Sequence, residues 1–339
     1  MNVLHLKKKE GNDVMKNQIK FICQKNDILF NDLQHNKNVD VVKEFYNINN
    51  PLLKFINRIH FSYTINKNKL LPLQFLWDKH NILYDYLFLE TRQTIIFVDS
   101  VLIYFPISLL KKLKAKHNLV LILLNPTTIM QENNAKAFLK YIDKNIFNLI
   151  LTFDKTDACK YQIEWINIPY SKYDIVNKSN DFTDICFIGR AKSRYTDLIN
   201  IFKKVKEHDL KCFFSIIGVS KKEIVESESI QYNKKMSYFE VLEKVNNTNC
   251  LLEYVDKTQN AATLRYCEAV CYNKKLLTNY EGVKELPYYN EEYIKIFKGE
   301  LTEDDITFIK EKCDVNYGYK NEFSPNFLIS QIKEMLDVD

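Results

Sequence analysis

The stretch DICFIGRAKSRY, residues 184–195, decides the fold. Its opening is mainly apolar and contains two isoleucines and a phenylalanine, as is typical of a buried strand. Gly189 then permits a sharp exit from the strand, and a helical pattern follows over residues 195–208. A buried strand that leads directly into a helix is the repeating unit of a parallel α/β sheet.

The same unit recurs through the rest of the second half. The sequence predicts further strands at residues 211–217, 250–255 and 275–278, and helices at residues 237–245, 262–272, 302–312 and 325–336. Short apolar strands that alternate with helices in this way predict one Rossmann-like domain.

The first half of the chain carries the same alternation in a weaker form. The expected strands are residues 1–6, 18–24, 94–98, 119–124 and 149–153, and the expected helices are residues 52–61, a helix opened by Pro106, and residues 131–145. A polar stretch around Pro169, residues 167–181, is the expected linker. We therefore predict an α/β protein with two Rossmann-like domains, residues 1–172 and 173–339, that face each other across a cleft. The last helix is expected to pack back on the N-terminal domain.

Composition excludes several classes of protein. The chain has 339 residues, of which 46% are hydrophobic, which is enough for two cores. The longest apolar stretch, residues 94–110, is too short and too interrupted to span a bilayer, and the N-terminus lacks the pattern of a signal peptide. Eight cysteines without metal-binding spacing indicate a reduced, cytosolic protein. With six glycines and neither GxGxxG nor GxxxxGK[ST], classical NAD sites and P-loops are not expected.

Charge is distributed unevenly along the chain. Residues 1–172 contain 24 Lys and Arg against 15 Asp and Glu, a net +9, whereas residues 173–339 contain 24 against 28, a net −4. A basic half suggests an anionic partner, either nucleic acid or an anionic membrane surface, and a merely solvated lysine-rich surface is the alternative.

The first candidate binding cluster follows the strand of residues 184–188. Gly189, Arg190, Lys192 and Arg194 lie at its carboxyl end, where ligands bind in open parallel sheets. The chain has 43 lysines and only five arginines, and two of the arginines fall within these residues. Because guanidinium groups donate in a planar fork that fits a diphosphate, we interpret the cluster as a phosphate site. The alternative is a strand-to-helix turn with solvated cations.

The second cluster opens the helix expected at residues 262–272. Thr263 and Leu264 lie near its first turn, where a hydroxyl and backbone N–H groups can bind phosphate. Arg265 and Glu268 follow three residues apart, so both can lie on one side of the helix, and the carboxylate could accept the hydroxyls of a ribose. The alternative is an Arg–Glu pair on the surface.

Three segments resemble GT-B glycosyltransferases, and more narrowly the bacterial enzymes of lipopolysaccharide core, O-antigen and capsule biosynthesis. They are LTFDKTDACKYQIEWINIPY (residues 151–170), DICFIGRAKSRY (residues 184–195) and TLRYCEAVCYNKKLLTNY (residues 263–280). The resemblance implies an acceptor-binding N-terminal domain and a nucleotide-sugar-binding C-terminal domain.

The resemblance also implies roles for single residues. Glu268 would hold the ribose, Thr263 and the neighbouring backbone amides would bind the diphosphate, and Arg190 with Lys192 or Arg194 would neutralise the leaving group. Enzymes of this fold stabilise that group with cations and helix dipoles, so no essential metal and no cofactor other than the nucleotide-sugar co-substrate are expected. Retaining members often carry a second glutamate eight positions earlier, but this chain has Asn260 there, which leaves the stereochemistry open.

Polar residues also follow the strands expected in the first half. Asp99, Asn125-Pro126-Thr127 and Asp154 would face the cleft if those strands are parallel. Asp99 is the first candidate for the general base of an inverting enzyme and is therefore assigned a catalytic role together with Arg190. Asp154 is better interpreted as the N-cap of a helix.

These observations together predict a hexosyltransferase of cell-surface polysaccharide biosynthesis with a lipid-linked glycan acceptor. A cytoplasmic location, peripheral at the inner face of the plasma membrane, and no nucleic-acid partner are expected. The cations expected to face an anionic membrane are Lys54, Arg58, Lys111, Lys112, Lys114 and Lys116, with Phe55 and Phe61 among them. Two alternatives are a GT-B-fold nucleotide-sugar epimerase and a catalytically silent, glycosyltransferase-like scaffold subunit.

Overall fold

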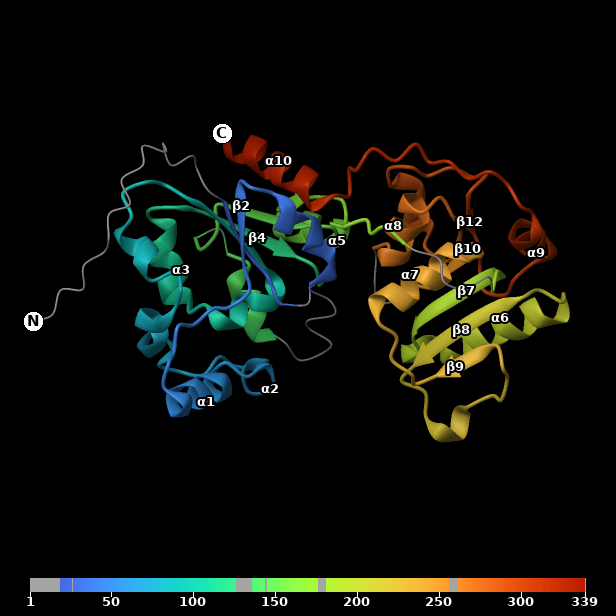
Figure 1. Cartoon of the computed structure of the whole chain (residues 1–339), viewed down its shortest axis with the longest axis horizontal. Helices are drawn as coiled ribbons and strands as arrows, with labels where there is room; N and C mark the ends of the chain where they lie inside the picture. Colours follow the sequence, from blue (N-terminus) through green and yellow to red (C-terminus); the bar gives the residue numbers. More distant parts are fainter. Residues whose placement is uncertain are drawn as a thin grey trace, which may run out of the picture.

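The computed structural model describes residues 19–25, 27–125, 136–143, 145–175, 181–255 and 261–338, and it contains two six-stranded sheets (Figure 1). Every pair of neighbouring strands in both sheets is parallel. The predicted fold class, α/β with two Rossmann-like units, is therefore confirmed. The boundary proposed at residues 172 and 173 falls between the two sheets and stays a prediction.

The first sheet has the strand order β2-β1-β3-β4-β5-β6. Its strands are β1 (Ile19–Ile22), β2 (Val39–Val42), β3 (Thr94–Val98), β4 (Asn118–Leu123), β5 (Leu149–Thr152) and β6 (Glu164–Trp165). The helices of this half are α1 (Pro51–His60), α2 (Tyr63–Asn66), α3 (Ile107–Lys114) and α5 (Lys155–Tyr161), with the 3-10 helices η1 (Ile28–His35), η2 (Gln74–His80), η3 (Asp85–Phe88), η4 (Asp99–Tyr104) and η5 (Lys136–Tyr141). Strands β3 and β4 are buried along their whole length, as expected for central parallel strands covered on both faces.

The second sheet has the strand order β12-β11-β10-β7-β8-β9. Its strands are β7 (Thr183–Arg190), β8 (Cys212–Ile217), β9 (Ile230–Tyr232), β10 (Thr248–Glu253), β11 (Lys275–Thr278) and β12 (Ile294–Ile296). The helices are α6 (Tyr195–Glu207), α7 (Tyr238–Asn246), α8 (Leu264–Cys271), α9 (Glu303–Lys310) and α10 (Pro325–Leu336), with the 3-10 helices η6 (Lys192–Arg194), η7 (Lys221–Glu223) and η8 (Glu281–Glu285). The order of the strands places β7 and β10 side by side at the centre, so their carboxyl ends share one edge of the sheet.

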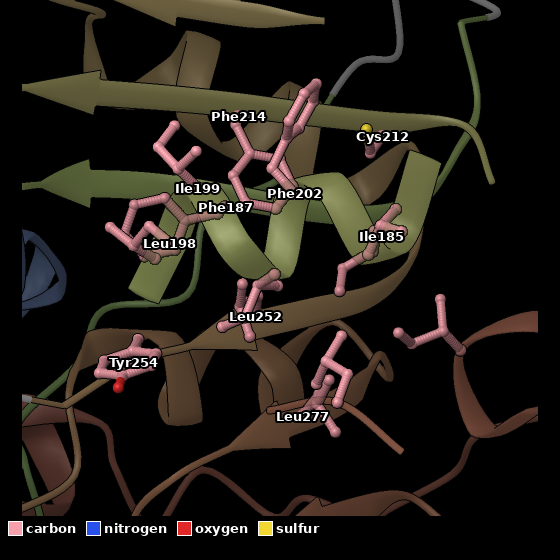
Figure 2. Close-up of a cluster of buried hydrophobic side chains, with 14 of the residues drawn as sticks. Ile185, Phe187, Leu198, Ile199, Phe202, Cys212, Phe214, Leu252, Tyr254 and Leu277 are labelled. Carbon is pink, nitrogen blue, oxygen red and sulfur yellow. The ribbon is translucent and has the colours of Figure 1, made fainter. Parts of the chain in front are cut away.

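Each sheet is sandwiched between two apolar layers, because successive residues of a strand point to opposite faces. On one face of the second sheet, Phe187 of β7, Phe214 of β8 and Leu252 of β10 pack with Phe202 of α6 (Figure 2). Leu251 and Leu276 lie on the opposite face with α8. This two-sided burial fixes the register of β7 and β10, and with it the position of the residues that follow them.

Helix α10 lies on the first sheet although it ends the chain (Figure 1). Leu328, Ile329 and Ile332 of α10 belong to the same buried cluster as Ile96 of β3 and Val120 of β4. The side chain of Asn36 also donates a hydrogen bond of 2.7 Å to Asn326. The C-terminal segment therefore crosses back from the second sheet and ties the two halves together.

Several expected elements differ from the observed ones. The strand expected at residues 1–6 lies outside the described residues, and the described part of the helix expected at residues 131–145 is the 3-10 helix η5. Strands β2, β6, β9 and β12 were not predicted. They have two to four residues each, which is too short for a readable apolar pattern.

No helix in the described ranges is long and apolar enough to cross a bilayer. The eight cysteines all lie within the described residues, and all are free thiols.

Candidate functional site

An open pocket of about 540 Å³ lies between the two halves of the molecule, at the carboxyl ends of β7 and β10. The first half contributes the apolar side chains of Leu29, Leu124 and Phe153, and the second half contributes most of the polar ones. The volume is within the range of small-molecule sites. Five residues predicted to bind the donor border this pocket together: Arg190, Arg194, Thr263, Leu264 and Arg265.

The residues after β7 hold one guanidinium in place and leave another exposed. Arg194 donates to the backbone oxygen of Arg190 at 3.1 Å and to that of Tyr254, and its guanidinium lies 5.7 Å from the centre of the Phe187 ring. The side chain of Arg190 is exposed, and within the described part of the chain it has no hydrogen bond or ion pair. Arg190 is therefore a cation at the mouth of the pocket that is available to an anion.

Gly189 leaves room for the Phe187 ring at the carboxyl end of β7. A Cβ atom at this position would lie 3.0 Å from the Phe187 ring and 3.5 Å from the guanidinium of Arg194. The first distance is tighter than an ordinary contact, so a larger residue would force the Phe187 ring to move, whereas the second is an ordinary van der Waals contact. For Lys192, which was predicted to belong to the same cluster, the structure describes the backbone in η6 and not the side chain.

The first turn of α8 is organised by a carboxylate. Thr263 is the N-cap, and its hydroxyl accepts the N–H of Arg265 at 3.1 Å. The same hydroxyl and the N–H of Thr263 both donate to Glu253, each at 2.7 Å. The donors of Thr263, which were expected to bind phosphate, are therefore used within the protein. The N–H of Leu264 is the first-turn donor that no described residue accepts.

Glu253 is a residue that the sequence analysis missed. It ends β10, is 2% exposed, borders the pocket and accepts a third hydrogen bond of 2.7 Å from the hydroxyl of Thr278. Burial raises the pKa of its carboxyl, while the hydrogen bonds from Thr278 and Thr263 oppose that shift. The sequence did contain a signal for Glu253: it is a carboxylate at the end of a mainly apolar strand, and the carboxyl ends of parallel strands are where polar site residues gather. Glu253 ties the start of α8 to β10 and β11.

Arg265 and Glu268 form a buried ion pair, not the surface pair that was the alternative at this spacing. Nη1 of Arg265 contacts Oε2 of Glu268, and Nη2 donates to the backbone oxygen of Ile188 at 3.2 Å. The other carboxylate oxygen accepts the hydroxyl of Tyr238 at 3.2 Å. Burial raises the pKa of Glu268, and the charge of Arg265 acts in the opposite direction.

This arrangement bears on the ribose role that the resemblance implied for Glu268. The carboxylate is 1% exposed, both of its oxygens have protein partners, and it is not part of the pocket lining. The side of α8 that carries Glu268 faces the core, and the pocket meets the start of the helix instead. In this structure Glu268 orients Arg265.

Asp99 lies at the carboxyl end of β3, behind the pocket wall. One oxygen accepts the N–H groups of Leu124 at 3.1 Å and of Asn125 at 2.9 Å, and the side-chain amide of Asn125 at 3.0 Å. Burial raises the pKa of the Asp99 carboxyl to about 6. Leu124 borders the pocket but Asp99 does not, so the carboxylate braces the exit of β4. Pro126 and Thr127 lie outside the described residues.

Asp154 has the structural role that was predicted for it. Its side chain accepts the N–H of Asp157 at 3.0 Å and caps α5. In the described ranges, no group of three or more His, Cys, Asp or Glu side chains could hold a metal ion.

The sequence matches no protein-family model, and no curated protein matches it. Solved structures do match. An alpha-glucosyltransferase in complex with UDP and a 13-mer DNA has a TM-score of 0.58 and 12% identity, over 94% of this chain and 99% of its own. The sucrose-phosphate synthase of Thermosynechococcus elongatus has a TM-score of 0.52 and 9% identity, over 95% and 98%. A UDP-GlcNAc 2-epimerase from Methanocaldococcus jannaschii has a TM-score of 0.48 and 14% identity, over 95% and 99%.

At these identities the matches bear on the fold and not on the reaction. The two that exceed a TM-score of 0.5 span nearly all of both chains, so the likeness covers both sheets and not a single Rossmann-like unit. The chain has the GT-B fold.

Proposed function

We propose that the chain is a glycosyltransferase that moves a hexose or deoxyhexose from a nucleotide-sugar donor to a glycan acceptor. One observation carries the proposal: Arg190, Arg194 and Arg265 line the same pocket between the two halves, and the first turn of α8 lines it with them. These residues come from two separate segments of the chain, residues 190–194 and 263–265, and they include three of its five arginines. A solvated surface would not concentrate them in this way.

The arrangement suits a diphosphate leaving group. Transfer of the sugar leaves two phosphate groups whose charge must be stabilised, and fixed donors do this without reorganisation. Arg194 and Arg265 are held by backbone oxygens, whereas Arg190 is free to close on a ligand. The N-terminal end of α8 adds its dipole and the N–H of Leu264. We propose that these groups bind the diphosphate without an essential metal.

The acceptor would enter from the first half, whose side of the pocket is apolar. We propose a lipid-linked glycan of cell-surface polysaccharide biosynthesis as the acceptor and a cytoplasmic enzyme at the membrane surface. Asp99 remains our prediction for a general base. Because its carboxyl is buried behind Leu124, it would need a movement of the β4 exit to reach an acceptor hydroxyl.

Two alternatives use the same fold. A nucleotide-sugar epimerase would need the same donor groups, and it would convert the free nucleotide sugar without an acceptor. A silent scaffold subunit would bind no nucleotide sugar. The observation that suits it is that Glu268 and the donors of Thr263 are already bonded to other protein groups.

A ligand panel tests the proposal. We expect UDP, GDP or dTDP, or one of their sugars, to raise the melting temperature of the protein, and slow release of nucleoside diphosphate from the matching sugar. Arg190→Ala should weaken nucleotide binding at least ten-fold, because it removes the exposed cation of the pocket. Arg92→Ala is the matched control, since Arg92 is also exposed but lies before β3 and does not border the pocket.

Different results separate the alternatives. Conversion of the nucleotide sugar into an epimer without release of diphosphate would identify an epimerase. No thermal shift with any member of the panel would leave the scaffold as the better interpretation. Loss of donor hydrolysis after EDTA treatment, restored by a divalent cation, would contradict the metal-free part of the proposal.

A further inference from the structure

The surface formed by α1, α2 and η2 exposes an unusual amount of apolar side chain. Ten of the sixteen large hydrophobic residues that are exposed in the described part of the chain fall within 25 positions: Leu52, Leu53, Phe55, Ile56, Ile59, Tyr63, Ile65, Leu73, Phe75 and Leu76. We call these ten residues the apolar surface. Single exposed apolar residues need no explanation, but a concentration of this kind marks an interaction site.

From this surface we infer that residues 50–79 dock the protein on an anionic lipid membrane. The inference does not depend on the donor site. The surface lies on the N-terminal half, and α1 and α2 are at the side of that half opposite to α10 (Figure 1). It is therefore free of the contacts that join the two sheets.

The exposed conformation is held by the interior of this region. Phe61, Trp77 and Ile48 form a small buried core beneath α1. Beside it Asn66, which is fully buried, donates to the backbone oxygens of His60 at 2.8 Å and Ser62 at 2.9 Å, and accepts the N–H of Leu71 at 2.8 Å. The apolar residues are thus left outside a formed core.

Two further bonds join α1 to η2. The indole of Trp77 donates to Nδ1 of His60 at 2.9 Å, and the other ring nitrogen of His60 lies 2.9 Å from the backbone oxygen of Pro72. His60 therefore has a structural role. These bonds fix α1, α2 and η2 to one another, so their exposed apolar side chains are held at fixed relative positions.

Charge identifies the partner. Residues 50–79 contain Lys54, Arg58, Lys67, Lys69 and Lys79 against the single Asp78, a net charge of +4. Lys54 and Arg58 lie on α1 among the apolar side chains and are exposed. Basic residues beside an exposed apolar helix face are the combination that binds at the surface of an anionic bilayer, where the cations meet the headgroups and the apolar side chains enter the acyl boundary.

The structure revises the docking face predicted from the sequence. Phe61 is buried in the small core. Three of the four lysines of and after α3 have partners within the protein, whereas Lys111 is exposed and has none among the described residues. Lys114 and Lys116 donate to the backbone oxygens of Phe147 and Leu87, and Lys112 lies 3.6 Å from Asp78. Lys54, Arg58 and Phe55 keep the role that was predicted for them.

Other partners fit less well. Duplex DNA is bound mainly through phosphate contacts from cations and polar groups, which would leave most of the ten side chains of the apolar surface in water. A second copy of this chain would bring a second net +4 against the first across the same surface. An anionic bilayer satisfies both the apolar side chains and the cations.

Sedimentation with lipid vesicles tests the inference on the full-length protein. We expect binding to vesicles with 30% phosphatidylglycerol in phosphatidylcholine, weak binding to pure phosphatidylcholine, and weaker binding in 0.5 M salt. The double variant Leu52→Ser/Phe55→Ser should lower the partition coefficient at least ten-fold. These side chains are 66% and 60% exposed, so folding should not suffer. Phe239→Ser, at 62% exposure on the C-terminal half, is the matched control.

A second pair of variants isolates the charge. Lys54→Gln/Arg58→Gln should lower binding to anionic vesicles about 30-fold, the equivalent of about 1 kcal/mol for each cation. Lys221→Gln/Lys222→Gln, two exposed lysines of the second half, should have no effect.

Three results would overturn the inference. The first is equal binding of the wild type to neutral and anionic vesicles, or no binding to either. The second is a wild-type dimer that Leu52→Ser/Phe55→Ser converts to a monomer, which would assign the surface to a second copy. The third is binding to duplex DNA that depends on Lys54 and Arg58 but not on Leu52 and Phe55. Nucleotide-sugar hydrolysis without lipid should be unchanged in all these variants, so failure of this inference is distinct from failure of the proposed function.

Discussion

Replacing Glu268 by alanine should destabilise the C-terminal half strongly, because it leaves the guanidinium of Arg265 buried without its counter-charge. The two side chains are 12% and 2% exposed, so solvent that enters the pocket can replace the lost partner of Arg265 only in part. Breaking a buried ion pair from one side typically costs about 3–5 kcal/mol. With a urea dependence of about 2 kcal/mol per molar for a domain of this size, the unfolding midpoint should fall by about 2 M.

The positions of the two tryptophans make the assay specific. Trp77 and Trp165 both lie in the first half of the chain, so tryptophan fluorescence reports unfolding of the first sheet. Circular dichroism reports both halves. In Glu268→Ala we expect the dichroism signal to fall at lower urea than the fluorescence signal, because the lost ion pair belongs to the second sheet.

A double variant separates the loss of a pair from the loss of a residue. Arg265→Met/Glu268→Gln removes both charges and keeps an acceptor for Tyr238, so it should regain most of the lost stability while nucleotide binding stays impaired. If Glu268→Ala moved the midpoint by less than 0.3 M but abolished nucleotide binding, the carboxylate would act on the ligand, and our assignment of Glu268 as the partner of Arg265 would be wrong.

Three further changes probe the surroundings of the pocket and of the apolar surface. The pKa of Asp99 is about 6 in the folded protein and about 4 in an unfolded chain, so ionisation of this carboxyl opposes folding. As the pH rises from 4 to 6, the free energy of unfolding of the wild type should therefore fall by about 3 kcal/mol relative to that of Asp99→Asn, measured by urea titration. If the difference in unfolding free energy between the wild type and Asp99→Asn did not change with pH, Asp99 would not ionise in this range. Thr263→Val removes the hydroxyl bonded to Glu253 and the cap of α8, and it should cost about 1–2 kcal/mol by dichroism, with no loss if α8 is held in another way. Asn66→Ala should cost about 2–3 kcal/mol and shift the emission of Trp77, whereas unchanged emission would show that the small core forms without it.

The parallel sheets were predictable because their central strands carry long apolar runs. Strand β4 and the interior of β7 are such runs, and both were expected within one or two residues of their observed bounds. Helix α10 (Pro325–Leu336) has its expected bounds, since Ser324 and Pro325 mark its start. The edge strands were not predictable in the same way, because a strand such as β6, with two residues, is formed by pairing with its neighbour and not by its own sequence.

The candidate site was predictable in its arginines and not in its carboxylates. Position along the chain placed Arg190 and Arg265 at strand and helix ends, and parallel topology then brings such ends together. Which face of α8 points to the core depends on how the helix packs on β10 and β11. Sequence spacing shows that Arg265 and Glu268 share a side of the helix, but it does not show whether that side meets solvent, ligand or protein.

Glu253 lines the pocket and Glu268 lies behind its lining, yet the pocket can still attract an anion because both carboxylates are bonded to other protein groups. Glu253 accepts three hydrogen bonds from Thr263 and Thr278, and burial raises its pKa, so its charge is both bonded and disfavoured. Glu268 directs its charge to Arg265 within the core. Each oxygen of the two carboxylates accepts a hydrogen bond from the protein, whereas Arg190 is exposed and has no hydrogen bond or ion pair in the described part of the chain. A negative ligand therefore meets arginine and the start of a helix first, and the glutamates serve to hold those groups at fixed positions before it arrives.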